Sequence, residues 1–154
     1  MSLPPVEYPV TIGGADAVLW QGPSAEVWLN HVLAIPGCLE FIVHASATRP
    51  RDPQGAYQEL SAWPENEDVP PTIPDNGFHL LISIDGQPRR LHVPDSTGTG
   101  STASTIAHHY CCRVTYAPGD RRVVVHVTWP RFHAVGEHAI DLLDIDRYVA
   151  GHRY

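Results

Sequence analysis

The sequence contains no lysine, and this absence already narrows the choice of partners. The ten basic residues other than histidine are all arginines, and 17 acidic residues outnumber them, which gives a formal net charge of −7. A protein that follows the phosphates of a nucleic acid needs a clustered basic surface. The composition therefore argues against nucleic acid as a partner.

Cysteine is also scarce, with three residues of which Cys111 and Cys112 are adjacent. This number does not build the disulfide framework of a small secreted domain. No charged-then-apolar leader is present, and no apolar run is long enough to cross a membrane. We therefore predict a cytoplasmic protein without membrane contact. At 154 residues, we expect a single domain over 1–154 that buries roughly 70% of the surface of its unfolded chain.

Sequence motifs typical of catalytic sites are absent as well. The chain has no Gly-x-Ser-x-Gly elbow and no dinucleotide-binding fingerprint. The run DSTGTGSTAST at Asp95–Thr105 is rich in glycine, serine and threonine, but a phosphate-binding loop needs a Gly-Lys-Ser/Thr ending and a following helix. We expect a flexible loop here that leads into a strand.

What the sequence does contain is sheet. In the stretch Ala107–Pro130, two runs rich in valine, threonine and tyrosine flank the turn residues Ala117–Asp120. We predict a hairpin with one face in the core and one face outside it. On the face outside the core, Cys111 lies opposite His126, with His109 beside them. Alternation assigns its core face to Tyr110, Cys112, Val114, Val123, Val125 and Val127.

A second hairpin is predicted from Glu26–Ala34 and Cys38–Thr48, which turn at Ile35-Pro36-Gly37. Strict alternation divides its residues between two largely apolar faces. We expect one face to meet the core and the other to meet a covering loop or a partner subunit. One face comprises Trp28, Asn30, Val32, Leu39, Phe41 and Val43, and the other comprises Val27, Leu29, His31, Leu33, Glu40, Ile42 and His44.

Shorter elements complete the pattern. A third hairpin is predicted around Asp85-Gly86, a dipeptide that favours tight turns. Its two strands are Phe78–Ile84 and Arg89–Val93. The remaining predicted elements are strands at Val6–Ile12, Ala17–Trp20 and Ala139–Leu143 and a helix at Ile145–Ala150. The proline-rich, acidic segment Arg49–Gly77 holds one or two helical turns around Tyr57–Ala62 and is either a mobile surface loop or a lid.

About eight strands without alternating helices predict an all-β antiparallel β-sandwich of jelly-roll or immunoglobulin-like topology. The turn Ile35-Pro36-Gly37 into CLEF, the SIDG hairpin, the Gly/Ser run before a long strand, and VTWP followed by an acidic strand resemble a group of uncharacterised β-sandwich proteins of high-GC actinobacteria. The resemblance extends from about Trp20 onward. It implies a fold and an origin, and it brings no activity or functional residue with it.

The sharpest candidate for chemistry is the cluster of His109, Cys111 and His126 on the hairpin face. Imidazole and thiolate are zinc ligands, and three protein ligands plus water form a catalytic type of zinc site. The alternatives are a cysteine nucleophile, with Cys111 activated by His126, and ordinary residues that are either exposed and polar or packed in the core. The metal hypothesis predicts a hydrolase or oxygenase with Arg49–Gly77 as its lid.

A further group, His133, Glu137 and His138, is predicted to lie in the connection after Trp129-Pro130. Its spacing matches neither the helical HExxH motif nor the pattern of cupins, so we interpret it as a solvated loop.

Because the chain combines two-faced apolar strands with no catalytic motif, the leading hypothesis is a non-enzymatic module that binds another protein or itself. Homodimerisation through the second hairpin is its most concrete form, and its histidines would make the interface pH-sensitive. The interface residues are Val27, Leu29, His31, Leu33, Ile42 and His44. A third hypothesis, a small-ligand or carbohydrate-binding module, uses Trp63 and Trp129 as stacking platforms.

Overall fold

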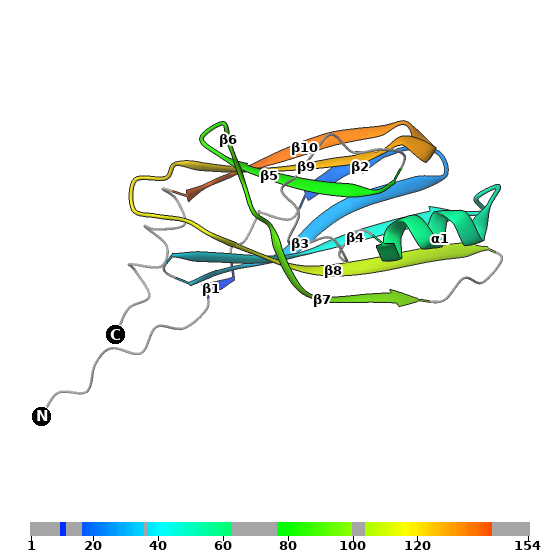
Figure 1. Cartoon of the computed structure of the whole chain (residues 1–154), viewed down its shortest axis with the longest axis horizontal. Coiled ribbons are helices and arrows are strands. Elements are labelled where there is room, and N and C mark those ends of the chain that lie inside the picture. The colour runs from blue at the N-terminus through cyan, green and yellow to red at the C-terminus, as the bar shows by residue number, and fades with distance from the viewer. Residues whose placement is uncertain (1–9, 12–16, 36, 63–76, 100–103, 143–154) are drawn as a thin grey trace, which may run out of the picture.

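The computed structural model describes residues 10–11, 17–35, 37–62, 77–99 and 104–142. Trp63, the predicted helix Ile145–Ala150, most of the predicted strand Val6–Ile12 and the second half of the Arg49–Gly77 segment lie outside the described residues. The described chain is mostly antiparallel sheet, as predicted, and forms two layers with one short α-helix between them at one end (Figure 1).

The first sheet has the strand order β1-β3-β4-β8-β7, and β2 pairs with the same strand, β3, that β1 pairs with. Its strands are β1 (Val10–Thr11), β2 (Ala17–Gln21), β3 (Ala25–Ile35), β4 (Cys38–Thr48), β7 (His92–Thr99) and β8 (Thr105–Thr115). The predicted hairpin of β3 and β4 is confirmed by their antiparallel register. The edge strand β7 contains Pro94 at a point where its pairing with β8 is irregular. The missing N–H of this proline therefore interrupts no regular hydrogen bond of the sheet.

The second sheet has the order β10-β9-β5-β6. Its strands are β5 (His79–Ile84), β6 (Gln87–Arg89), β9 (Arg122–Trp129) and β10 (Ala134–Asp141). Asp85 and Gly86 have φ values of 50° and 81°, as the tight primed turn between β5 and β6 requires. The 3₁₀ helix η2 (Pro130–Phe132) joins β9 to β10.

One hydrophobic core lies between the inner faces of the two sheets. Its largest fully buried side chains are Trp129, Tyr110, Phe41 and Phe78. The Phe78 ring stacks on Tyr110 of β8 at 5.3 Å and meets Trp129 of β9 edge-on at 5.5 Å, so these aromatic contacts join the two layers.

The predicted hairpin of Ala107–Pro130 is wrong. β8 pairs with β4 and β7, whereas β9 pairs with β10 and β5, so the chain crosses from one sheet to the other between them. The predicted core faces of both strands are nevertheless buried. Alternation fixes which face of a strand is apolar, but two such faces can lie side by side in one sheet or opposite each other across a core, and here they lie opposite.

The predicted faces of the second hairpin are also partly wrong, because β3 contains a bulge at His31. The register jumps between Asn30 and Leu33, and His31 has a left-handed φ of 51°. One extra residue reverses the alternation, so Val27 and Leu29 before the bulge are fully buried in the core. These two residues therefore cannot belong to an outer interface.

The helix α1 (Pro53–Ala62) is longer than the one or two turns predicted. Asp52 caps it, accepting a hydrogen bond from the Gly55 N–H at 3.0 Å, and Pro53 occupies the first helical position. The helix packs against β8, where its buried residues Ala56 and Leu60 face the core. Among the described residues, no helix combines the length and the apolar character that a membrane crossing needs.

Two further boundaries differ from the prediction. Asp95–Thr99, expected to be loop, belongs to β7 and pairs with β8. Glu137 and His138, also expected in a loop, belong to β10, which begins at Ala134. In both places pairing with an adjacent strand overrides weak local strand propensity.

The strand β2 lies across the seam between the two sheets, because it pairs with β3 and also contacts β10. Gly136 of β10 makes this approach possible. A Cβ atom at this position would overlap the carbonyl oxygen of Leu19 and lie 2.8 Å from its carbonyl carbon. The absence of a side chain at Gly136 therefore allows β2 to close one side of the two-layered structure.

Candidate functional site

The outer face of the first sheet, which points away from the core, carries a row of rings across three strands. Trp28, His44 and His109 occupy directly opposed positions on β3, β4 and β8. The Trp28 and His44 rings stack with centroids 4.1 Å apart and planes 11° apart, and His109 meets His44 edge-on at 4.0 Å. Val18 of β2 extends the row at the position opposite Trp28 and is 59% exposed. We call the three rings, together with Val18 at their end, the ring row.

His44 is the most constrained member of the ring row. Its Nε2 lies 3.1 Å from Oδ1 of Asn30, its ring is half-buried, and two histidines lie nearby. Burial is the main cause that lowers the pKa of His44 to about 4, and His109 and His31 lower it further because they disfavour a second positive charge. The imidazole of His44 is therefore neutral at physiological pH.

This environment predicts a pH-dependent contribution to stability. Because the pKa of His44 is lower in the folded chain than its ordinary value of 6.5, stability should be greatest above pH 6.5 and fall as the pH decreases towards 4. We expect a loss of about 1 kcal/mol, after allowing for solvent screening of this half-exposed group. Urea unfolding between pH 4 and pH 7 should show a smaller pH dependence in His44→Gln, and equal slopes would contradict the assignment.

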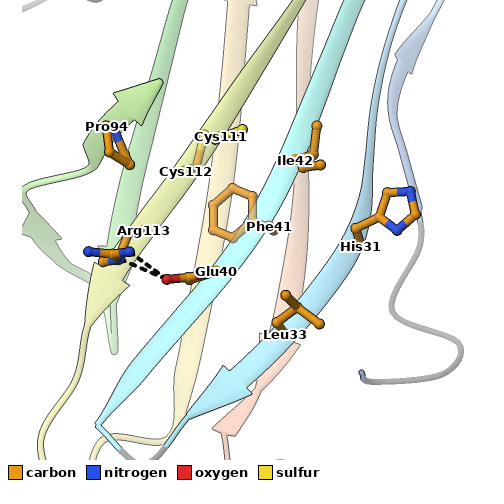
Figure 2. A pocket seen from close by; sticks show the side chains of 9 residues that line it. All are labelled: His31, Leu33, Glu40, Phe41, Ile42, Pro94, Cys111, Cys112 and Arg113. Atoms are coloured by element: carbon orange, nitrogen blue, oxygen red, sulfur yellow. Dashed lines mark hydrogen bonds and ion pairs between the residues drawn. The ribbon is translucent and has the colours of Figure 1, made fainter. Parts of the chain in front are cut away.

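A hollow of about 250 Å³ lies next to the ring row on the same sheet face (Figure 2). Figure 2 shows His31 and Leu33 on β3, Ile42 on β4 and Cys111 on β8, with Pro94 of β7 on the far side. The bulge at His31 is what turns Leu33 to this face beside Ile42. The hollow is therefore walled mainly by apolar side chains, and it is open to solvent.

Two charged side chains form the end of the hollow. Arg113 donates from Nε to Oε1 of Glu40 at 2.9 Å, and its Nη2 lies 2.7 Å from the same oxygen. Both side chains are partly exposed, so the pair adds little to stability. Its main effect is to neutralise the charge of this edge of the hollow.

The thiol of Cys111 does not have the environment of a nucleophile. Burial raises its pKa, and the negative charges of Asp95 and Glu40 raise it further. Burial also raises the pKa of Cys38, which lies on the same face. Both thiols are therefore protonated at neutral pH, and no described cation counteracts this enough to activate Cys111.

The structure does not bring the predicted metal ligands together. His109 and Cys111 lie on the outer face of the first sheet, whereas His126 lies on β9 in the second sheet. Within the described part of the chain, no group of three or more histidine, cysteine, aspartate or glutamate residues is arranged to hold a metal ion. The error follows directly from placing β8 and β9 in one hairpin.

The two aromatic residues predicted to stack on a ligand are Trp63 and Trp129, and only Trp129 lies within the described residues. Trp129 is completely buried, so it cannot stack on a ligand. Trp28 is half-buried on the outer face of the first sheet, on the same side as His44, whereas strict alternation predicts these two residues on opposite faces. Recognising the bulge at His31 would have been needed to find it.

Comparison with protein-family models, with curated proteins and with solved structures finds no match to this chain. The resemblance to actinobacterial β-sandwich proteins therefore stays a prediction.

Proposed function

We propose that the chain is a self-associating module whose interface is the outer face of the first sheet. The observation that supports this most is the apolar character of a face that an antiparallel sheet usually gives to solvent. Leu33 and Ile42 line the hollow, and Trp28 and the 59% exposed Val18 lie next to it in the ring row. Apolar side chains that gather at the surface of one sheet face are typical of an interaction site.

Charge favours a second copy of the chain as the occupant. Each chain carries a formal charge of −7, so two copies repel each other wherever their acidic surfaces meet. On the proposed interface, Arg113 neutralises Glu40, and His44 is uncharged at physiological pH. A two-fold axis near Ile42 would also allow the Arg113 of each copy to approach the Glu40 of the other. His31, Leu33, Ile42 and His44 thus remain from the predicted interface, and Trp28 joins them.

Light scattering tests this proposal. We expect twice the chain mass of 17.0 kDa at pH 8, and weaker association at about pH 4, because protonating His44 on both copies brings like charges together. Ile42→Glu should weaken dimerisation by about 100-fold, since it buries an unpaired carboxylate. Ala139→Glu, at an exposed position of the second sheet, is the matched control and should leave the mass unchanged. A monomer at both pH values would contradict the proposal.

We also propose an immunoglobulin-like topology for the fold. The order β3-β4-β8-β7 corresponds to immunoglobulin strands A, B, E and D, and the order β10-β9-β5-β6 corresponds to G, F, C and C′. This correspondence favours the immunoglobulin-like alternative over the jelly roll. The inner faces of β4 and β9 carry no cysteine, so the disulfide of antibody domains has no counterpart here. An experimental structure with traced strand connections would test the assignment.

A further inference from the structure

Three polar side chains meet on the outer face of the second sheet, on the opposite side of the molecule from the ring row. Ser83, His126 and Glu137 come from the adjacent strands β5, β9 and β10. Glu137 lies directly opposite His126 in the ladder, and Ser83 is the diagonal neighbour of His126 on the other side. The sequence places these residues 54 positions apart at the extremes, so only the strand order β10-β9-β5 joins them.

Their atoms are aligned as nucleophile, base and orienting acid. The Oγ of Ser83 lies 3.3 Å from Nε2 of His126, and Nδ1 of His126 lies 3.1 Å from Oε2 of Glu137. A carboxylate beside Nδ1 favours the tautomer that carries its proton on that nitrogen. Nε2 is then left with a free lone pair facing the Ser83 hydroxyl, which is the arrangement that activates serine in triads on unrelated folds.

The surroundings of Ser83 define what could react there. Val124 is opposite Ser83 and Leu81 is opposite His126, so two apolar side chains flank the pair. Arg122 is the second diagonal neighbour of Ser83 and is exposed, with Asp141 opposite it on β10. A long side chain at a diagonal position reaches across the ladder, so its guanidinium can approach an oxyanion formed at Ser83. The His126 and Glu137 side chains are 37% and 67% exposed, which leaves the site open to solvent.

We propose that Ser83, His126 and Glu137 form a hydrolytic site for carboxylic esters with small acyl groups. Ser83 Oγ bonds to the carbonyl carbon while its proton passes to His126 Nε2, and the carbonyl electron pair moves to oxygen. The bond between carbon and the leaving oxygen then breaks, and the leaving alkoxide takes the proton from Nε2. Water repeats both steps on the acylated serine and releases the carboxylic acid. Glu137 acts as a positioning residue for the imidazole.

The openness of the site sets the substrate class. The sheet uses its backbone N–H groups in the ladder, so we assign stabilisation of the oxyanion to Arg122 at the diagonal position, and esters with good leaving groups suit such a site best. The apolar side chains beside the pair, Leu81, Val124 and Pro88, form a small surface for the acyl group, which favours acetyl-sized chains over long ones. This inference does not depend on self-association, because it concerns the other sheet.

Covalent labelling and hydrolysis test the proposal on the full chain. A fluorophosphonate should add its phosphonyl group to the protein with release of fluoride, and peptide mapping should place the adduct on Ser83. Hydrolysis of p-nitrophenyl acetate should fall about 100-fold in Ser83→Ala and in His126→Ala, as expected for loss of a nucleophile or a general base. Glu137→Gln should lower kcat about tenfold and leave KM unchanged, because it misorients the imidazole without removing a substrate contact.

Matched controls separate this chemistry from general surface reactivity. Ser46→Ala and His92→Ala, both in the first sheet, should keep wild-type labelling and hydrolysis. The substituted side chains of the second sheet are at least partly exposed, so circular dichroism should show folded variants throughout. An unlabelled wild-type protein, an adduct mapped to another residue, or hydrolysis unchanged in Ser83→Ala would each overturn the proposal.

Discussion

Replacing Trp129 by alanine is expected to lower the free energy of unfolding by about 4 kcal/mol, as is usual when a buried tryptophan is truncated in a core. Trp129 is completely buried and is the largest side chain of the core. Its ring meets Phe78 edge-on at 5.5 Å and Phe132 at 4.5 Å. Truncation would leave a cavity beneath α1 and between these two rings, and a rigid pair of sheets cannot collapse into it completely.

Trp129 also fastens the helix to the second sheet. Its Nε1–H donates to Oε1 of Glu59 in α1 at 3.0 Å, and the same carboxylate accepts hydrogen bonds from Arg131 at 2.7 to 2.9 Å. Trp129→Phe keeps an aromatic ring but removes the N–H, so we expect a smaller loss of about 2 kcal/mol. Arg131 still satisfies the Glu59 carboxylate in that variant.

Equilibrium unfolding in urea gives the measurement for both variants, with the midpoint and the slope fitted separately. An unchanged slope would show that the loss lies in stability and not in a changed unfolded state. If the alanine variant were no less stable than the phenylalanine variant, the assignment of Trp129 as the main core residue between α1 and the sheets would be wrong.

Gly136→Ala is expected to destabilise the chain by about 2 kcal/mol and to displace β2 from the seam. The obstacle is backbone, since the new Cβ would overlap the Leu19 carbonyl oxygen, and the Trp20 Cβ is only 3.2 Å away. Neither strand can yield without lengthening its ladder bonds. Faster hydrogen exchange of the amides of Ala17–Gln21 should therefore accompany the loss of stability.

Ala139→Val is the matched control for this substitution. Ala139 is exposed on the same strand, so a larger side chain there should change the free energy of unfolding by less than about 0.5 kcal/mol. If both variants had the same stability and the same exchange rates at Ala17–Gln21, the close approach of β2 to Gly136 would be refuted.

The sequence predicts local features of this fold well, and its failures occur where strands must be assigned to partners. The buried faces of β8 and β9 follow from alternation alone, and the turn at Asp85-Gly86 follows from residues that tolerate positive φ. Alternation does not report whether consecutive strands share a sheet. Because of this ambiguity, the predicted site contains His126 next to Cys111, whereas the structure places His126 beside Ser83 and Glu137.

The bulge in β3 marks a second limit. Histidine adopts positive φ more readily than most residues, but it does so at few of its positions, and the apolar pattern does not indicate the extra residue. Strict alternation therefore predicts the wrong face for the first half of β3, and it does not predict the stacking of Trp28 on His44. Short polar segments such as Asp95–Thr99 are strands only because β8 supplies their partners.

The order of strands in the second sheet also determines when that sheet can form during synthesis. β5 leaves the ribosome well before β9, which is the partner that separates it from β10. At ordinary translation speeds, roughly 2 to 8 s pass between the emergence of Ile84 and that of Arg122. Throughout this interval the apolar residues Leu80, Ile82 and Ile84 of the β5–β6 hairpin lack the strand that completes their layer. The nascent chain therefore exposes the hydrophobic segment of β5 to chaperones until β9 has left the ribosome.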